Sequence, residues 1–403
     1  MTDIFELIRQ MCPDGVAVTT VSEIGALYGG LSGKGRDDFK NGNAHFASYM
    51  NVYANMELDL TVGDKVVVNA DENQKMLQRG DIIFTGSSET PDECGFSSVV
   101  MEEPAEPWYL NSFCFFLRLN DVDLLLPGFS KYLFRSENLR KQIIATANGI
   151  TRFNVSKAKF LKIRIPLPPL QIQREIVAIL DKFDSYCNSM TAGLAGELEM
   201  RRKQYRYWAE HLVMDGNVEM VELGKLCRIN KGTQMNKSDY QDGPYPIYNM
   251  GAEPSGTHTE YNRDIPSIVI AGHGNSCGFV NWVDEPFWAG GGCYYLDSLA
   301  PDLSNRYLYH AMKVREGFLM GLGSHGPIRH LYPRTIARLQ VPVPVSVPGT
   351  GAWDIARQQS ICDTLDKFLT LEHELEHELE LRRKQYEYYR DMLLSFPERK
   401  ENA

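Results

Sequence analysis

Three short motifs in this sequence place residues at spacings that enzymes use for chemistry. His373-Glu374-Leu375-Glu376-His377 has the form HExxH, in which two histidines on one helical face bind zinc and the glutamate acts as a base. Gly274-Asn275-Ser276-Cys277-Gly278 has the form GxSxG, which carries the nucleophilic serine of many hydrolases. The glycine-rich stretch 29–35 is similar to a phosphate-binding loop, but glycine stands where that loop requires serine or threonine.

The sequence around these motifs argues against catalysis. The HExxH match lies in a tandem Glu-His-Glu-Leu repeat over residues 372–379, whose leucines form an apolar stripe typical of a packed helix. Residues 279–292, after GxSxG, are rich in glycine, proline and tryptophan, so the helix that a nucleophile elbow requires is not expected, and a polar surface loop is favoured. The D/N-P-P-Y/F motif of adenine methyltransferases does not occur in the sequence. We therefore expect no catalytic residues and no metal site.

Composition and charge set the class of protein. The chain has 403 residues, 43% of them hydrophobic, and a net charge of -10. The charge is unevenly distributed: residues 130–165 contain nine Lys/Arg and one acid, and residues 304–345 contain six Lys/Arg and one acid. Because a phosphate backbone responds to the field within about 10 Å, two such stretches are compatible with DNA, although solvated helical faces explain them equally well.

The chain is also an internal repeat, which predicts two similar halves. Arg201-Arg202-Lys203-Gln204-Tyr205 recurs as Arg382-Arg383-Lys384-Gln385-Tyr386, and Leu180-Asp181-Lys182-Phe183 recurs as Leu365-Asp366-Lys367-Phe368. Proline-rich hinges, a G-x-x-R sequence and a front segment recur in the same order. Such periodicity indicates a duplicated structural unit.

Each half has the same plan. We expect a mixed α/β (α+β) fold with globular domains over 1–165 and 216–345, each followed by a hinge and a helical spacer, over 166–215 and 346–403. Apolar residues at three- and four-residue spacing predict long helices over 170–213 and 354–396. We expect these helices to pack together as an antiparallel coiled coil, giving a pseudo-two-fold repeat, with the first helix broken at Gly193 and Gly196.

At this point the sequence resembles a known family. Two variable domains, each followed by a PLPPL-like hinge, an ILDKF segment and an LRRKQYEYYRD-like helix, are similar to the specificity (S) subunits of type I restriction-modification systems. The resemblance covers essentially the whole chain. The second hinge departs from the family pattern through a longer VPGTGAWD insertion, but Gln358 and Gln359 still precede the helix.

The resemblance implies a non-catalytic protein that recognises double-stranded DNA. Each globular domain would be a target-recognition domain that reads one half of a bipartite, asymmetric site, and the helices would fix the spacing between the halves. They would also dock two methylation (M) subunits, which bind S-adenosylmethionine, while motor-nuclease (R) subunits use ATP and Mg²⁺. The chain itself would bind no cofactor.

Candidate DNA-binding residues come from polar loops at positions that the repeat makes equivalent. Three groups are predicted, listed half by half: Lys34, Arg36 and Lys40 with Lys231, Thr233 and Lys237; Ser87 and Ser88 with His273 and Asn275; Arg152 with Arg329. Lysine and arginine hold phosphates and polar side chains contact base edges. We expect Arg152 and Arg329 to bind phosphates, although fold-supporting bonds remain the alternative.

Two further expectations concern the environment of the chain. It has no run of 18 apolar residues and its first residues lack the pattern of a signal peptide, so a cytoplasmic protein without membrane contact is expected. The eight cysteines form no CxxC pair and are expected to be reduced, mostly in the core. An enzyme in its own right and a coiled-coil adaptor without DNA contact remain the alternative functions.

Overall fold

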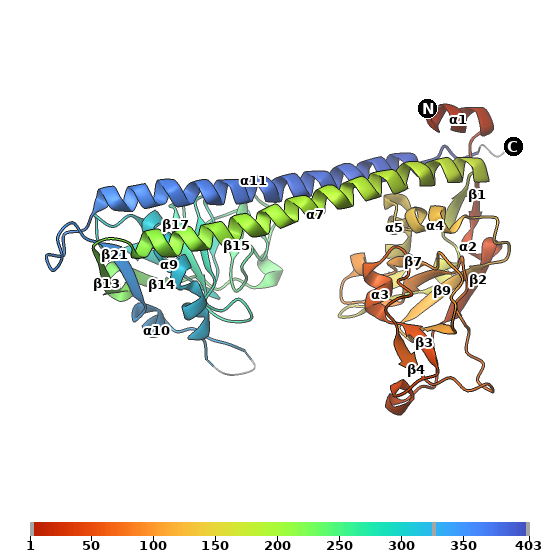
Figure 1. Ribbon diagram of the computed structural model, residues 1–403, viewed down its shortest axis with the longest axis horizontal. Coiled ribbons are helices and arrows are strands. Elements are labelled where there is room, and N and C mark those ends of the chain that lie inside the picture. Colours follow the sequence, from red (N-terminus) through yellow and green to blue (C-terminus); the bar gives the residue numbers. More distant parts are fainter. Residues whose placement is uncertain (1–3, 325–327, 400–403) are drawn as a thin grey trace. The chain divides into compact units, whose positions relative to one another are not determined.

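The computed structural model of the chain describes residues 4–324 and 328–399, which form two compact units (Figure 1). Unit 1 comprises Met1–Ala192 and Glu380–Ala403, and unit 2 comprises Gly193–Leu379. Each unit therefore contains one globular domain and parts of both long helices, α7 (Leu170–Met214) and α11 (Ile355–Leu393). This confirms the mixed α/β fold with two domains and two long helices.

The main sheet of unit 1 has four strands in the order β2-β9-β5-β7, all antiparallel to their neighbours. Its strands are β2 (Gly25–Gly29), β9 (Cys114–Leu119), β5 (Ile82–Thr85) and β7 (Ser97–Val99). Successive side chains point to opposite faces of a strand, so both faces of this sheet are covered by apolar side chains. Ile82 and Phe84 pack on one face with helices α4 (Pro127–Leu133), α5 (Glu137–Ile144) and α7, while Ile83 packs on the other face.

Three smaller sheets complete unit 1. β1 pairs with β12, β3 lies between β4 and β8, and β11 lies between β10 and β6. Their bounds are β1 (Ala17–Thr20), β12 (Arg164–Leu167), β3 (Ala44–Ala47), β4 (Asp64–Val66), β8 (Trp108–Leu110), β6 (Ser87–Ser88), β10 (Ala147–Asn148) and β11 (Phe153–Val155). The remaining elements are α1 (Ile4–Met11), α2 (Val21–Ile24), the 3-10 turns η1 (Arg36–Phe39) and η2 (Pro91–Glu93), α3 (Tyr49–Ala54) and α6 (Lys157–Phe160).

Unit 2 repeats three of these four sheets, and among its described residues an isolated bridge between His273 and His330 takes the place of the β6–β11 pairing. Its main sheet has the order β14-β20-β17-β18, β13 pairs with β21, and β15 lies between β16 and β19. The strand bounds are β13 (Val218–Glu222), β14 (Cys227–Lys231), β15 (Tyr245–Tyr248), β16 (Thr257–His258), β17 (Ser267–Ala271), β18 (Val280–Val283), β19 (Trp288–Ala289), β20 (Cys293–Ser298) and β21 (Gln340–Pro344). The helices are α8 (Leu223–Leu226), η3 (Lys237–Asp239), α9 (Asn305–Gly321) and α10 (Pro333–Ala337). The internal repeat is thus a repeat of folded units.

The two long helices run antiparallel to each other. In unit 1 the Phe183 ring of α7 lies 5.3 Å from the Tyr389 ring of α11, and in unit 2 Arg202 of α7 binds Glu376 of α11. Residue numbers therefore rise along α7 as they fall along α11. The predicted break at Gly193 and Gly196 is wrong, because α7 is continuous through both. A glycine costs a helix only about 1 kcal/mol, which the turns on either side can offset.

The repeated sequence motifs form the joint between each globular domain and the helix pair. In unit 2 the Asp366 carboxylate accepts hydrogen bonds from Arg306 Nε at 2.8 Å and His310 Nε2 at 2.8 Å, and the Tyr205 hydroxyl lies 3.0 Å from His310 Nδ1. These three hydrogen bonds join α11, α9 and α7. Asp366 belongs to the LDKF motif and Tyr205 to the RRKQY motif, so both repeats act in positioning the helices.

Unit 1 has the same joint with one histidine replaced by tyrosine. The Asp181 carboxylate accepts from the Tyr132 hydroxyl at 2.6 Å and from Lys131 Nζ at 2.9 Å. Burial, together with the charge of Asp184, raises the pKa of Tyr386, the counterpart of Tyr205 in the repeat. Asp181 and Tyr132 thus stand at the positions of Asp366 and His310, whereas the cation of the joint comes from a different position in each half.

Two general properties of the chain follow from the described residues. Within these ranges, no helix combines the length and apolar character needed to cross a lipid bilayer. All eight cysteines are free and six of them are buried, as expected from their spacing.

Candidate nucleic-acid interface

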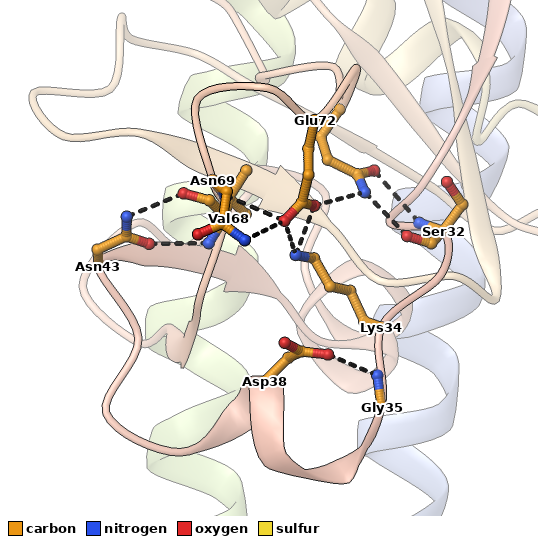
Figure 2. A network of polar contacts seen from close by, with 9 residues as sticks. Ser32, Lys34, Gly35, Asp38, Asn43, Val68, Asn69 and Glu72 are labelled. Atoms are coloured by element: carbon orange, nitrogen blue, oxygen red, sulfur yellow. Dashed lines mark hydrogen bonds and ion pairs between the residues drawn. The ribbon is translucent and has the colours of Figure 1, made fainter.

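Lys34 lies in a polar network that connects the loop after β2 to the loop after β4 (Figure 2). Its ammonium donates to Glu72 Oε1 at 2.6 Å, and only 6% of the side chain is exposed. The hydrogen bond from Lys34, with further bonds from Asn69 and Gln74, lowers the pKa of Glu72 to about 2. The charge of Lys34 is thus balanced within the protein, which makes Arg36 and Lys40 the exposed cations of this segment.

Ser87, Ser88 and Arg152 meet in one pocket of about 640 Å³ in unit 1. Ser87 and Ser88 form β6, which pairs with β11 directly after Arg152. Arg152 Nη2 donates to Ser87 Oγ at 3.2 Å, and the guanidinium lies over the Phe113 ring, 5.5 Å from its centroid. The structure therefore brings together two of the three predicted groups of this half, the serines and the arginine.

The pocket has acidic groups on its wall. Glu93 accepts hydrogen bonds from the Tyr53 hydroxyl at 2.9 Å and from Ser88 Oγ at 3.0 Å. These bonds, the Tyr53 bond foremost, lower the pKa of Glu93, so its carboxylate is charged at neutral pH. Glu89, which is exposed, also lines the pocket. Sequence reasoning found the serines of this pocket but gave Glu93 no role.

In unit 2, the predicted residues Lys231 and His273 lie near each other, and His330 lies beside them. The His273 and His330 rings stack with centroids 5.4 Å apart. Burial, with His330 and Lys231 nearby, lowers the pKa of His273, so this histidine is neutral at pH 7 and can both donate and accept hydrogen bonds. Asn275 is exposed two residues after His273.

The ladder contacts correct the predicted equivalence of Arg152 and Arg329. Val155 N donates to Gly86 O in unit 1, and Leu331 N donates to Gly272 O in unit 2, so Val155 and Leu331 are counterparts. Counting back along the strand, Arg329 matches Phe153, and Arg152 matches Ile328. The predicted alignment matched Gly149 with Gly326, and it was off by one residue. Gly326 itself lies outside the described residues. A one-residue shift turns a side chain to the opposite face of a strand.

Arg329 accordingly has different contacts from Arg152. Its guanidinium donates to Met320 O near the end of α9, and its carbonyl accepts from Gly274 N at 2.9 Å. The side chain satisfies a helix-terminal carbonyl, whereas Arg152 faces a pocket.

The loop equivalences shift in the same way. Gly30 N donates to Cys114 O and Gly232 N donates to Cys293 O, which makes these glycines counterparts and aligns Lys231 with Gly29. The prediction paired Arg36 with Thr233 and Lys40 with Lys237, but in the structure Arg36 and Lys237 correspond more closely, because each begins a 3-10 turn and is exposed. Thr233 has a backbone role, since its N donates to Ala289 O at 2.8 Å.

Much of the basic character of residues 130–165 and 304–345 is engaged inside the protein. The Arg140 guanidinium donates to the carbonyls of Gly95, Asp92 and Cys94, and burial lowers its pKa to about 10. Lys131 and Arg306 belong to the joints described above. These residues support the fold, so the counts of Lys and Arg overstate the surface available to phosphates.

Several exposed cations of these stretches lie in or directly after two equivalent short helices, α6 and α10. Ile163 N donates to Phe160 O and Leu339 N donates to Ile336 O, so Lys162 and Arg338 are counterparts, and both are exposed. Lys159 Nζ donates to Asn148 Oδ1 at 3.1 Å, which places α6 beside the β10–β11 hairpin that carries Arg152. Sequence reasoning missed Lys162 and Arg338. Both lie the same number of residues before the proline-rich hinge of their half, and this equal spacing could have identified them in the sequence.

The HExxH and GxSxG sequences lie in structural settings that differ from those of enzymes with these motifs. Glu372 and Glu376 of the tandem tetrads both lie within ion-pair distance of Arg202, and the described residues contain no cluster of three His, Cys, Asp or Glu side chains suited to a metal ion. After GxSxG the chain enters the strand β18, where a nucleophile elbow would need a helix.

Comparison with known proteins agrees with this organisation. The family model described as the type I restriction modification DNA specificity domain matches residues 13–200 and again 215–381. The chain is 30% identical over 269 residues to the EcoR124I/EcoR124II specificity subunit of Escherichia coli, an alignment that spans 59% of this chain and 63% of that protein.

A solved structure is similar along nearly the whole chain. It belongs to work on complex assembly and conformational transition of the type I R-M system, and it shares the fold with a TM-score of 0.59 and 17% identity, covering 94% of this chain and 97% of the other. The double match of the family model falls on the two units described above. The chain therefore belongs to the type I restriction-modification DNA specificity subunits, the non-catalytic components that carry target recognition.

Proposed function

We propose that each unit reads one half of a bipartite, asymmetric DNA site. The observation that carries this proposal is that both units share one scaffold but have different side chains at equivalent positions. Ser87 corresponds to His273, and Arg152 corresponds to Ile328. Because base edges are distinguished by the donors and acceptors that face them, such differences give two different half-sites.

Within this proposal, the candidate residues of both units contact DNA. The twelve candidates are Lys34, Arg36, Lys40, Ser87, Ser88, Arg152, Lys231, Thr233, Lys237, His273, Asn275 and Arg329. Lys162 and Arg338 join them as phosphate contacts, because they are exposed and equivalent. Arg36, Lys40, Arg152, Lys231 and Lys237 are exposed and therefore available to DNA, while the bonds of Lys34 and Arg329 support the fold first.

The helices set the spacing between the half-sites and dock two methylation subunits. Tyr207 and Tyr388 occupy the same position after the RRKQY motif, and they are 54% and 67% exposed. Exposed aromatic residues are favoured at protein interfaces, and one such residue in each half suits two copies of the same partner. S-adenosylmethionine would then enter with the methylation subunits, and ATP and Mg²⁺ with the motor-nuclease subunits, in the cytoplasm.

Methylome sequencing of the host with and without this gene tests the function. We expect one gapped motif, with two unlike halves and methylated adenines, to disappear from the strain that lacks the gene. An unchanged methylome, or loss of a continuous palindromic motif, would refute the proposal.

A further inference from the structure

The pocket around Arg152 has features that separate base recognition from phosphate binding. Its lining contains one cation, Arg152, and two carboxylates, Glu89 and Glu93. A phosphate placed there would meet more negative than positive charge. A carboxylate can instead accept a hydrogen bond from the amino group of cytosine, and an arginine can donate two hydrogen bonds to O6 and N7 of guanine.

The guanidinium of Arg152 is held in place before any ligand arrives. Ser87 Oγ accepts one of its hydrogen bonds at 3.2 Å, and Phe113 lies beneath it. Among the described residues, no carboxylate lies within ion-pair distance of Arg152, so most of its donors remain available. A guanidinium fixed in this way can donate two hydrogen bonds to one base, for which the ammonium of a mobile lysine is less suited.

The rim of the pocket is apolar and exposed. Met50 and Phe113, which line it, are 61% and 57% exposed, and Ile150, two residues before Arg152, is 93% exposed. Exposed apolar side chains that gather around a polar pocket indicate a binding surface. In the major groove of DNA, such groups contact thymine methyl groups, which phosphates do not offer.

Phosphate contacts are available next to the pocket. Lys159 of α6 is bonded to Asn148 on the same hairpin as Arg152, and Lys162 follows on the same surface segment. Lysines beside the pocket and an arginine within it match the usual division between contacts that position DNA and contacts that specify sequence.

We propose that Arg152 reads a guanine in the half-site recognised by unit 1, with the Met50–Phe113 rim against neighbouring bases. This assignment rests on the proposed function, because it names the base contact within the same DNA site. It replaces the phosphate role expected from the sequence alone.

The test uses the full chain in complex with its methylation subunits and a fluorescent duplex that carries the mapped motif. Each G·C pair of the motif is replaced in turn by A·T, and the dissociation constant is measured by anisotropy from about 50 to 200 mM salt. In the wild type, replacing one G·C pair should weaken binding at least about five-fold. Arg152→Ala and the charge-conserving Arg152→Lys should both abolish that preference at this one pair. Preferences in the other half-site should persist, which shows that the variants are folded.

Lys162→Ala is the matched control. It should weaken binding to all duplexes alike and reduce the salt slope by about one, because one phosphate contact is lost. If Arg152→Ala behaves like Lys162→Ala, or if both Arg152 variants keep every base preference, the assignment is wrong. If the wild-type complex binds the motif no better than a scrambled duplex, the proposed function itself fails.

Discussion

One buried glutamine near the start of each long helix fixes that helix to its globular domain. Gln173 Oε1 accepts from Leu126 N at 2.9 Å, and Gln358 Oε1 accepts from Ser304 N at 2.9 Å. Both side chains also donate to backbone carbonyls, and both are fully buried. Each glutamine therefore satisfies backbone groups that would otherwise be buried without partners.

We expect Gln173→Ala and Gln358→Ala each to destabilise the chain by about 2 to 4 kcal/mol, because several buried polar groups lose their partners. Hydrogen exchange should show the loss at α4 for the first variant and at α9 for the second. Gln359→Ala is the control, since this neighbour is exposed and should change stability by less than about 0.5 kcal/mol. Equal effects of Gln358→Ala and Gln359→Ala would contradict this role.

His310 makes the stability of unit 2 depend on pH. Burial lowers its pKa despite the opposing effect of Asp366, and Arg306 lowers it further. Burial by itself would raise the pKa of Asp366, but bonds from His310 and Arg306 hold it below its ordinary value. The folded state thus binds fewer protons than the unfolded chain, so stability is full above about pH 6.5 and falls as the pH decreases.

We therefore expect wild-type unit 2 to lose stability between pH 7.5 and pH 5, by about 1.4 kcal/mol for each unit of pKa depression. His310→Gln should lose less over this range. Urea unfolding followed by tryptophan fluorescence measures the difference, because Trp282 lies 5.9 Å from Tyr309 in the same part of the unit. The exposed His330→Gln serves as the control. A pH dependence that is the same in His310→Gln as in the wild type would contradict this explanation.

At the residue scale, the sequence predicted which kinds of residue line the candidate site better than it predicted their pairing. Ser87, Ser88 and Arg152 do share a pocket, but Arg152 and Arg329 are one position out of register. The repeat is too weak in the loops to fix an alignment to one residue. Ladder hydrogen bonds supply that register, and they exist only in the folded chain.

At the scale of elements, periodicity predicted the regular structure closely. The helices expected over 170–213 and 354–396 span Leu170–Met214 and Ile355–Leu393. Isolated glycines were a poorer guide. Gly193 and Gly196 suggested a break, but no neighbouring atom lies within 4 Å of the position of a Cβ at either, and the helix continues through both.

The Glu-His-Glu-Leu tetrads of α11 allow a test of the spacing role. One tetrad adds about 6 Å to a helix and rotates the remainder of that helix by about 40°. Deleting Glu376–Leu379 brings Glu380 to the position of Glu376, so the ion pair with Arg202 can re-form and the leucine stripe is kept. We predict unchanged half-sites and a gap shorter by one base pair, or two at most, since base pairs rise about 3.4 Å each.

Mapping the methylated motif of the deletion variant measures the gap. A third copy of the tetrad should lengthen it equally. Glu376→Gln is the control, because it removes the charge and keeps the length, so the gap should not change. A deletion variant that methylates sites with the original gap would show that α11 does not set the spacing.

At the scale of the whole molecule, the duplicated joints predict two docking sites for one kind of partner. Tyr207 and Tyr388 are equivalent and exposed. We expect Tyr207→Ala or Tyr388→Ala to reduce the number of bound methylation subunits from two to one, and the double variant to lose both. Native mass spectrometry of co-expressed complexes counts them. Tyr186→Ala, on an exposed tyrosine of α7 outside the motif, should leave two. Two subunits retained by the double variant would exclude this surface.

The central claim is that two copies of one fold each read one half of a gapped DNA site. Its most direct test is the affinity of the assembled complex for four duplexes with a constant gap: both halves intact, either half scrambled, or both scrambled. We predict that each scrambled half weakens binding independently, so that the two losses in free energy add and the fully scrambled duplex binds only non-specifically. If scrambling one half has no effect, or if it already removes all specific binding, the two units do not read the site as separate halves.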